Sequence, residues 1–87
     1  MSNKEEAFTL CQLRDMILKG SQATGNDKYS VNLRVSCPQG KPIGIHHTHP
    51  GGEPEPSDQD IREAHRLGIP FMCITVPERK VTKCYRV

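Results

Sequence analysis

Residues 43–60 read IGIHHTHPGGEPEPSDQD, and this stretch predicts a buried strand, a stiff turn and the start of a helix. Side chains alternate between the two faces of a strand, so His47 and His49 leave one face and His46 leaves the other. Pro50 lacks a backbone N–H and therefore ends the strand. The glycines and prolines that follow let the chain reverse and stiffen its return.

The helix start carries the second half of the pattern. Ser57 and Asp60 form Ser-x-x-Asp before an amphipathic run, which is typical of a capping box. Taken separately, His-x-His is more often a polar strand pair and Ser-x-x-Asp a plain cap. Together they bring two imidazoles and one carboxylate, those of His47, His49 and Asp60, towards one point. Three nitrogen and oxygen ligands with a fourth position left open are typical of catalytic zinc, whereas structural zinc usually has four protein ligands.

Length and charge set broad limits. The chain has 87 residues, which predicts a single domain spanning residues 1–87. A net charge of +2 with scattered basic residues does not favour nucleic acid as a partner. The sequence has no apolar run long enough to span a membrane, and its first residues do not resemble a signal peptide. We therefore expect no membrane association and a cytoplasmic location.

Hydrophobic periodicity predicts an α/β fold. It consists of a mostly antiparallel, mixed β-sheet of about six strands with one helix packed against it. The helix is expected from Ser57 to Leu67, with Gly68 as its C-cap, and residues 20–27 are expected to form a loop. The predicted strands are residues 6–13, 15–19, 29–36, 43–49, 71–76 and 81–87.

The chain has four cysteines and no Cys-x-x-Cys pair. The expectation is that Cys11, Cys37, Cys73 and Cys84 are small buried hydrophobic residues. Cys73 and Cys84 lie on consecutive predicted strands and could face each other. A disulfide between them stays open, although a reducing cytosol disfavours it.

The two motifs together resemble the signature of a known family. Residues 47–50 (HTHP) followed by residues 57–60 (SDQD) resemble the signature of the JAMM (MPN-type) zinc metalloproteases, in a short stand-alone form. The likeness extends through the predicted helix into residues 71–74 and 84–85. It implies a minimal JAMM/MPN-like layer arrangement, similar to that of cytidine deaminases. It also implies one Zn²⁺ per chain, held by the two histidines and the aspartate already named.

The resemblance further implies hydrolysis of an amide by metal-activated water, with an upstream glutamate as general base. Only Glu5 and Glu6 precede the histidine pair. We expect Glu6 to be the base because it leads the apolar alternation of Phe8 and Leu10. Glu5 stays open as the alternative, since strand register is not fixed by the sequence. By the same resemblance, Ser57 would stabilise the oxyanion.

The family likeness also implies a substrate class. The expected substrate is a protein. The bond cleaved would be an isopeptide bond or a C-terminal peptide bond of a ubiquitin-like or other small modifier protein, as in deubiquitinases. Homo-oligomerisation is left open. Two other classes remain, a non-catalytic MPN-type scaffold and a RadC-like domain of uncertain activity. The intact His47, His49, Ser57 and Asp60 favour the hydrolase over the scaffold.

Overall fold

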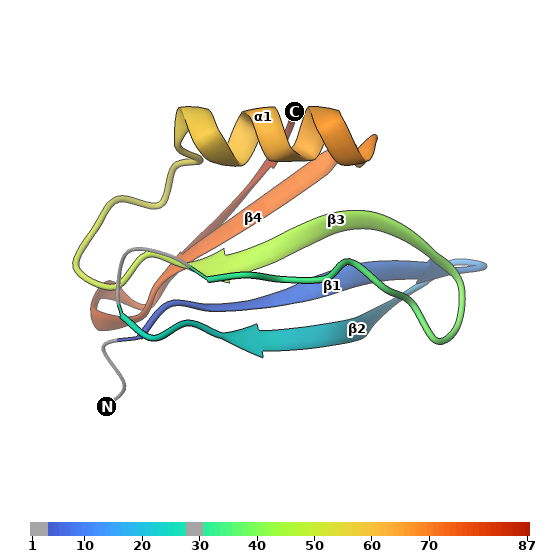
Figure 1. The fold of residues 1–87 in the computed structure, drawn as a ribbon, viewed down its shortest axis with the longest axis horizontal. Helices are drawn as coiled ribbons and strands as arrows, with labels where there is room; N and C mark the ends of the chain where they lie inside the picture. Colours follow the sequence, from blue (N-terminus) through green and yellow to red (C-terminus); the bar gives the residue numbers. More distant parts are fainter. Residues whose placement is uncertain (1–3, 28–30) are drawn as a thin grey trace.

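The computed structural model describes residues 4–27 and 31–87. Within them, one α-helix, α1 (Asp58–Leu67), packs on a five-stranded sheet of order β2-β1-β3-β4-β5 (Figure 1). β3 and β4 are parallel, and the other neighbouring strands are antiparallel. The α/β fold with a mixed sheet and one helix is confirmed, with five strands instead of about six. The remaining elements are β1 (Glu6–Leu13), β2 (Met16–Thr24), β3 (Lys41–Thr48), β4 (Phe71–Val76), the 3₁₀-helix η1 (Pro77–Arg79) and β5 (Val81–Arg86).

The strand predicted at residues 29–36 is the one that the sheet lacks. Tyr29 and Ser30 lie outside the described residues. Residues 31–37, which we call the wall segment, keep the predicted alternation of half-buried and exposed side chains but form no strand ladder. Isolated hydrogen bonds connect the wall segment to the sheet. The Ser21 N–H donates to the Ser36 carbonyl (3.0 Å), and the Ser36 N–H donates to Thr9 Oγ1 (3.3 Å). The prediction was wrong because alternation reports burial on one face, and burial does not require backbone pairing.

Conversely, β2 extends into the region predicted to be a loop. Residues 20–24 have the small, polar composition of a loop, yet they pair with β1 as far as Glu6 opposite Thr24. Gly20 is needed here, because a Cβ at that position would overlap the carbonyl oxygen of Ser36. The close approach of the wall segment explains this glycine, and the sequence alone does not reveal it.

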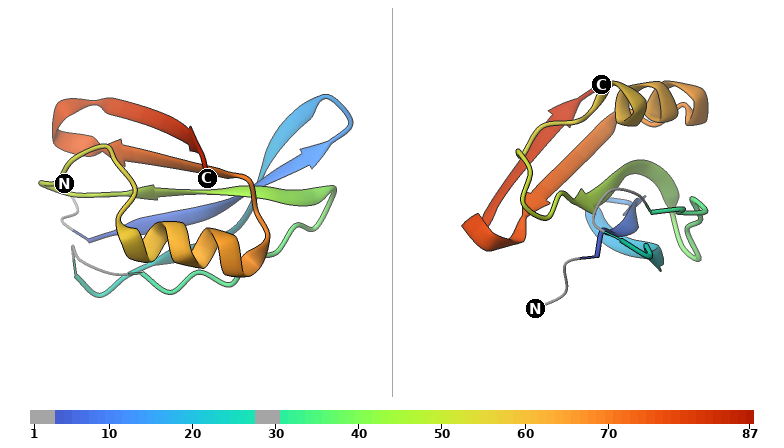
Figure 2. Two further views of the ribbon diagram at one scale, coloured as in Figure 1. Left: turned by 90° about the horizontal axis from the view of Figure 1, so that it is seen from above. Right: turned by 60° about the vertical axis from the view of Figure 1, so that its left-hand side comes forward.

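The sheet has two unlike faces. On the first, the site face, α1 lies over β3 and β4 while the wall segment lies over β1 and β2 (Figure 2). Ala64 of α1 is fully buried there against Ile45, Ile69, Met72 and Ile74. In the described part of the chain, no helix lies on the second face, which we call the open face (Figures 1 and 2). None of the described helices is long and apolar enough to cross a membrane.

The buried face of β1 is the opposite of the one expected from its apolar residues. Its buried residues are Ala7, Thr9 and Cys11, whereas Phe8 and Leu10 are only half buried and lie on the open face. Phe8 stacks there on the ring of His46, with centroids 4.5 Å apart. Phe8 and Leu10 had indicated the wrong face of β1 as the core face. The site face is covered by both α1 and the wall segment, so β1 has room there only for small side chains.

All four cysteines form disulfides, and of the expected small buried residues only Cys11 and Cys73 are buried. Cys11–Cys37 joins β1 to the end of the wall segment, with Cα atoms 5.8 Å apart. Cys73–Cys84, the pair left open above, links directly opposed residues of β4 and β5 with Cα atoms 4.0 Å apart. The first pairing depends on the path of the wall segment, which the sequence did not predict.

Candidate metal centre

The start of α1 fixes the carboxylate of Asp60. The Asp60 N–H donates to Ser57 Oγ (3.1 Å), and the Ser57 N–H donates to Asp60 Oδ2 (2.8 Å). The predicted capping box is therefore confirmed, as is the left-handed C-cap at Gly68 (φ 70°). Because the cap orients the side chain, Oδ2 of Asp60 faces the sheet instead of moving freely in solvent.

The histidines come from the end of β3. His47 is buried on the site face, and His49 lies one residue beyond the strand. The His49 N–H donates to the Thr75 carbonyl (2.9 Å), which keeps its backbone aligned with β4. The two rings meet edge to face with centroids 4.6 Å apart. Both imidazoles therefore lie on one side, as the two-residue spacing predicted.

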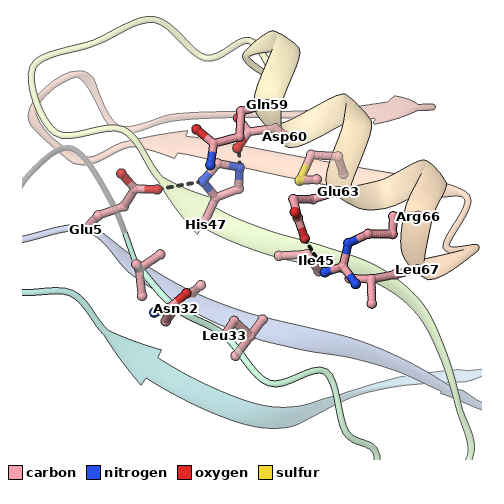
Figure 3. Close-up of a pocket in the computed structure, with 13 residues that line it drawn as sticks. Glu5, Asn32, Leu33, Ile45, His47, Gln59, Asp60, Glu63, Arg66 and Leu67 are labelled. Carbon is pink, nitrogen blue, oxygen red and sulfur yellow. Dashed lines mark hydrogen bonds and ion pairs between the residues drawn. The ribbon is translucent and has the colours of Figure 1, made fainter.

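The three predicted ligands are close together. Oδ2 of Asp60 lies 3.3 Å from Nε2 of His47 and 3.4 Å from Nε2 of His49. Zinc bonds of about 2.0–2.1 Å in a tetrahedral arrangement place neighbouring donor atoms about 3.3–3.4 Å apart. The two distances from Asp60 Oδ2 therefore match the spacing of neighbouring zinc ligands. Figure 3 shows His47 and Asp60 turned towards each other from the sheet and the helix.

The far side of each imidazole is held by a hydrogen-bond partner. Nδ1 of His47 lies 3.0 Å from Oε1 of Glu5, and Nδ1 of His49 lies 3.0 Å from the carbonyl oxygen of Glu53. A carbonyl only accepts, so Nδ1 of His49 donates, and in the neutral ring this leaves the Nε2 lone pair facing Asp60. Sequence analysis missed the role of Glu53, because a backbone carbonyl leaves no signal in a sequence.

One buried atom lacks a partner. Nε2 of His47 is buried and makes no hydrogen bond to any of the described residues, although Oδ2 of Asp60 is near. An unsatisfied buried ring nitrogen in a native fold calls for an explanation. A metal ion bound to this nitrogen would supply one, and the donor set of imidazoles and carboxylates is one that zinc accepts.

Electrostatics favour a cation at the centre. Burial alone would raise the pKa of Asp60, but contacts with the imidazoles of His47 and His49 outweigh it and hold this pKa well below its ordinary value. The contact with Asp60 in turn raises the pKa of His49, against the lowering effect of burial. Asp60 is therefore ionised at neutral pH, and a metal must displace a proton that His49 holds more firmly than usual.

The structure brings Glu5, and not Glu6, to this centre. Glu5 is buried one residue before β1, and its carboxylate oxygen lies within 4.8 Å of ligand atoms of His47 and His49. Glu6 is exposed on the open face, and its N–H donates to Thr48 Oγ1 (2.9 Å). The expectation that Glu6 faces the histidines is not met, because the small residues of β1, and not Phe8, occupy the site face.

Glu5 could itself complete a metal-binding group with the two histidines. The arrangement of the rings favours Asp60 as the third ligand. Both Nε2 atoms converge on Asp60, whereas Glu5 contacts the opposite nitrogen of His47. Glu5 is thus placed to orient His47, and it also lines both hollows beside the centre.

Comparison with known proteins yields one match. The family described as prokaryotic homologs of the JAB domain (Prok-JAB) matches residues 4–87, nearly the whole chain. Neither the search of curated proteins nor the search of solved structures found a match. A family match over this length, on a fold with a mixed sheet and one helix, establishes the relationship. The chain therefore belongs to the prokaryotic homologs of the JAB domain.

Proposed function

We propose that this protein is a zinc-dependent metallopeptidase that hydrolyses an amide bond. The observation that carries the proposal is the convergence of the two imidazole Nε2 atoms on Oδ2 of Asp60, at 3.3 Å and 3.4 Å. His47, His49 and Asp60 would hold one Zn²⁺. When bound there, zinc supplies a Lewis acid for the scissile carbonyl and lowers the pKa of water to about 7.

Glu5 is our candidate for the group that moves the proton. A general base must lie within hydrogen-bond reach of the proton that it takes, directly or through one water. The carboxylate of Glu5 lies within 4.8 Å of the histidine ligand atoms, and Glu5 lines two hollows that also border Asp60. Glu5 would take a proton from the attacking water and pass it to the leaving amine.

Ser57 is our candidate for the oxyanion donor. Its Oγ already accepts the Asp60 N–H, so its own hydroxyl proton remains to be donated. It lines the hollow beside His49, within the same helix turn as Asp60. Ser57→Gly removes the hydroxyl at a cost of only a few tenths of a kcal/mol, because glycine is tolerated at an N-cap. We expect it to lower kcat by about 10²–10³-fold at an almost unchanged Tm.

The proposed substrate is an extended segment of a protein. Family resemblance favours the C-terminal tail of a ubiquitin-like or other small modifier protein. The short loop between His49 and Ser57 favours a thin, extended chain over a large folded surface.

The test is a matched pair of glutamate variants. We expect the wild-type protein to bind about one zinc per chain and to hydrolyse extended peptides. Glu5→Gln should keep zinc and lower kcat by about 10²–10⁴-fold. Glu6→Gln, on the open face, should change neither. Zinc content by elemental analysis and turnover of quenched fluorescent peptides provide the readouts.

Each other outcome has a defined meaning. If Glu5→Gln lowers zinc affinity by about 10–100-fold but leaves turnover intact at saturating zinc, Glu5 orients His47 and another group moves the proton. If Glu6→Gln is the inactive variant, the assignment of the two glutamates is reversed. A folded wild-type protein that neither binds zinc nor cleaves peptides would contradict the proposal and favour the scaffold.

A further inference from the structure

His49 precedes a loop, residues 50–56, that we call the site loop. At its first corner the Gly52 N–H donates to the His49 carbonyl (3.0 Å), and Gly51 has a φ of 71°. A proline followed by a residue with positive φ, as here, is typical of a type II turn. The turn brings the chain back towards its own start, where the Glu53 carbonyl accepts from Nδ1 of His49 (3.0 Å). The backbone of the site loop therefore orients one of the proposed metal ligands.

The direction of the Glu53 carbonyl depends on the residue that follows it. Pro54 is buried, whereas Glu53 and Glu55 on either side of it are exposed. The peptide bond between Glu53 and Pro54 is planar, and the proline ring locks φ of Pro54. A single soft torsion, ψ of Pro54, therefore separates the two carbonyl groups. Any contact that holds the Pro54 carbonyl also limits the direction of the Glu53 carbonyl.

The Tyr85 hydroxyl makes such a contact. Tyr85 lies on β5, 31 residues further along the chain, and its hydroxyl donates to the Pro54 carbonyl (2.6 Å). β5 runs beside the site loop (Figure 2). The tyrosine ring is half buried and packs against the core. On the sheet Tyr85 lies opposite Met72, next to the Cys73–Cys84 disulfide. The hydroxyl therefore reaches the site loop from a ring and a strand that are themselves held in place.

We propose that Tyr85 is a positioning residue for the metal ligand His49. Its hydroxyl holds the Pro54 carbonyl, and the locked proline passes this constraint to the Glu53 carbonyl. The Glu53 carbonyl in turn keeps the proton of neutral His49 on Nδ1, with the Nε2 lone pair facing Asp60. This inference rests on the proposed zinc site and assigns β5 a role in it. Tyr85 acts on the centre only through the backbone of the site loop.

A second link to the site loop comes from η1 and supplies the control. Arg79 Nη1 lies 3.2 Å from Glu53 Oε2, but these two side chains are 54 % and 75 % exposed. An ion pair this exposed contributes little and is screened by salt. It also ends on the side chain of Glu53, which rotates independently of the carbonyl that His49 contacts. The hydroxyl of Tyr85, and not the guanidinium of Arg79, should therefore govern the orientation of the imidazole.

The experiment compares Tyr85→Phe with Arg79→Met. Tyr85→Phe removes one oxygen and keeps the ring in the core, so the fold should be retained. Zinc affinity, measured by competition with a chelator, should fall about tenfold, the lower end of the range for outer partners of metal-bound histidines. Arg79→Met should stay within about twofold of the wild type. The visible absorption spectrum of the Co²⁺-substituted protein should change only in Tyr85→Phe, because this spectrum reports ligand geometry and not overall stability.

A second readout needs no metal. Long-range ¹H–¹⁵N NMR of the metal-free protein, at a pH where its imidazoles are neutral, reports which ring nitrogen carries the proton. His49 should hold its proton on Nδ1 in the wild type and populate both tautomers in Tyr85→Phe. The ring of His46, which bonds to Thr75 on the open face, should be the same in both proteins.

The two readouts separate this inference from the proposed function. If the wild type binds zinc and Tyr85→Phe binds it equally well, the role of Tyr85 is overturned while the zinc site stands. Equal losses in Tyr85→Phe and Arg79→Met would also overturn it, because any disturbance of the site loop would then suffice. If the wild type binds no zinc, a tautomer change in Tyr85→Phe would support the positioning of His49 and contradict the zinc enzyme. No zinc binding and no tautomer change would overturn both.

Discussion

The two faces of the sheet carry the same pair of residue types in neighbouring positions. On the site face, Glu5 contacts His47, and both are buried beside Asp60. On the open face, one residue along each strand, Glu6 is exposed and His46 is only half buried. His46 stacks on Phe8 and its Nε2 bonds to Thr75 Oγ1 (2.8 Å). The pair on the site face forms a candidate metal centre because α1 brings the carboxylate of Asp60 to it, and no described helix does so on the open face.

Exchanging the histidines for alanine should give the largest difference between the faces. His47→Ala removes a predicted ligand and should lower zinc affinity by more than 100-fold, since loss of an outer partner alone costs about 10–100-fold. His46→Ala should leave zinc affinity within a few fold and cost stability instead, through its lost contact with Phe8. Competition with a chromogenic chelator measures both. Equal loss of zinc in the two variants would remove the distinction between the faces.

The disulfides offer the next largest difference, because one lies on each face. For closed loops with sequence separations of 26 and 11, chain entropy predicts about 3.5 and about 2.8 kcal/mol of stability, respectively. Cys11→Ala/Cys37→Ala should therefore lower the free energy of unfolding more than Cys73→Ala/Cys84→Ala does, as measured by urea denaturation. Only the first should speed hydrogen exchange at the Ser36 amide. Faster exchange at Ser36 in the second variant would show that the wall segment is not held as described.

The pH dependence of zinc binding should separate His49 from His46. The pKa of His49 is raised by Asp60, so below that pKa a proton must leave for a metal to bind. Zinc affinity should therefore fall by about tenfold per pH unit as pH decreases, beginning above the ordinary histidine pKa of about 6.5. Calorimetry across pH measures this, with His46→Phe as the control. A curve that moves with His46→Phe would contradict the assignment.

The smallest expected effect concerns His46 and acid stability. Burial, together with the charges of His47 and Lys19, lowers the pKa of His46 in the folded protein. Its contribution is fully present above the unfolded-state pKa of about 6.5 and is lost as pH falls towards the lowered folded pKa, because the unfolded chain binds the proton first. His46→Phe should make the metal-free protein lose less stability between pH 7 and pH 5. Denaturation curves at the two pH values would show it, and an unchanged pH dependence would contradict it.

Much of the site could be read from local patterns. The two-residue spacing of His47 and His49, the stop at Pro50 and the capping box of Ser57 and Asp60 all lie within one stretch of the chain. Each depends on strand pleat or helix-cap geometry, which a few neighbouring residues determine. The helix with its caps, and the convergence of the His47, His49 and Asp60 side chains, followed from these rules without knowledge of the remaining chain.

What lies outside that stretch was predicted less well. The choice between Glu5 and Glu6 was decided by which face of β1 receives α1 and the wall segment, and the apolar alternation of Phe8 and Leu10 indicated the opposite face. The side chains of the wall segment alternate in burial like those of a strand, but its backbone forms no strand ladder. These are outcomes of packing between segments far apart in sequence, where the space available, and not the hydrophobicity of a residue, decides its face.

The sequence by itself determined the donor atoms and their local directions, because backbone geometry repeats over two residues in a strand and over one turn at a helix start. Only the tertiary structure decided which glutamate lies beside them, which cysteines pair, and which segments flank the site. Those outcomes depend on contacts between residues distant in the chain, such as Glu5 with His47 and Cys11 with Cys37. Local periodicity carries no information on such contacts until the layers are packed together.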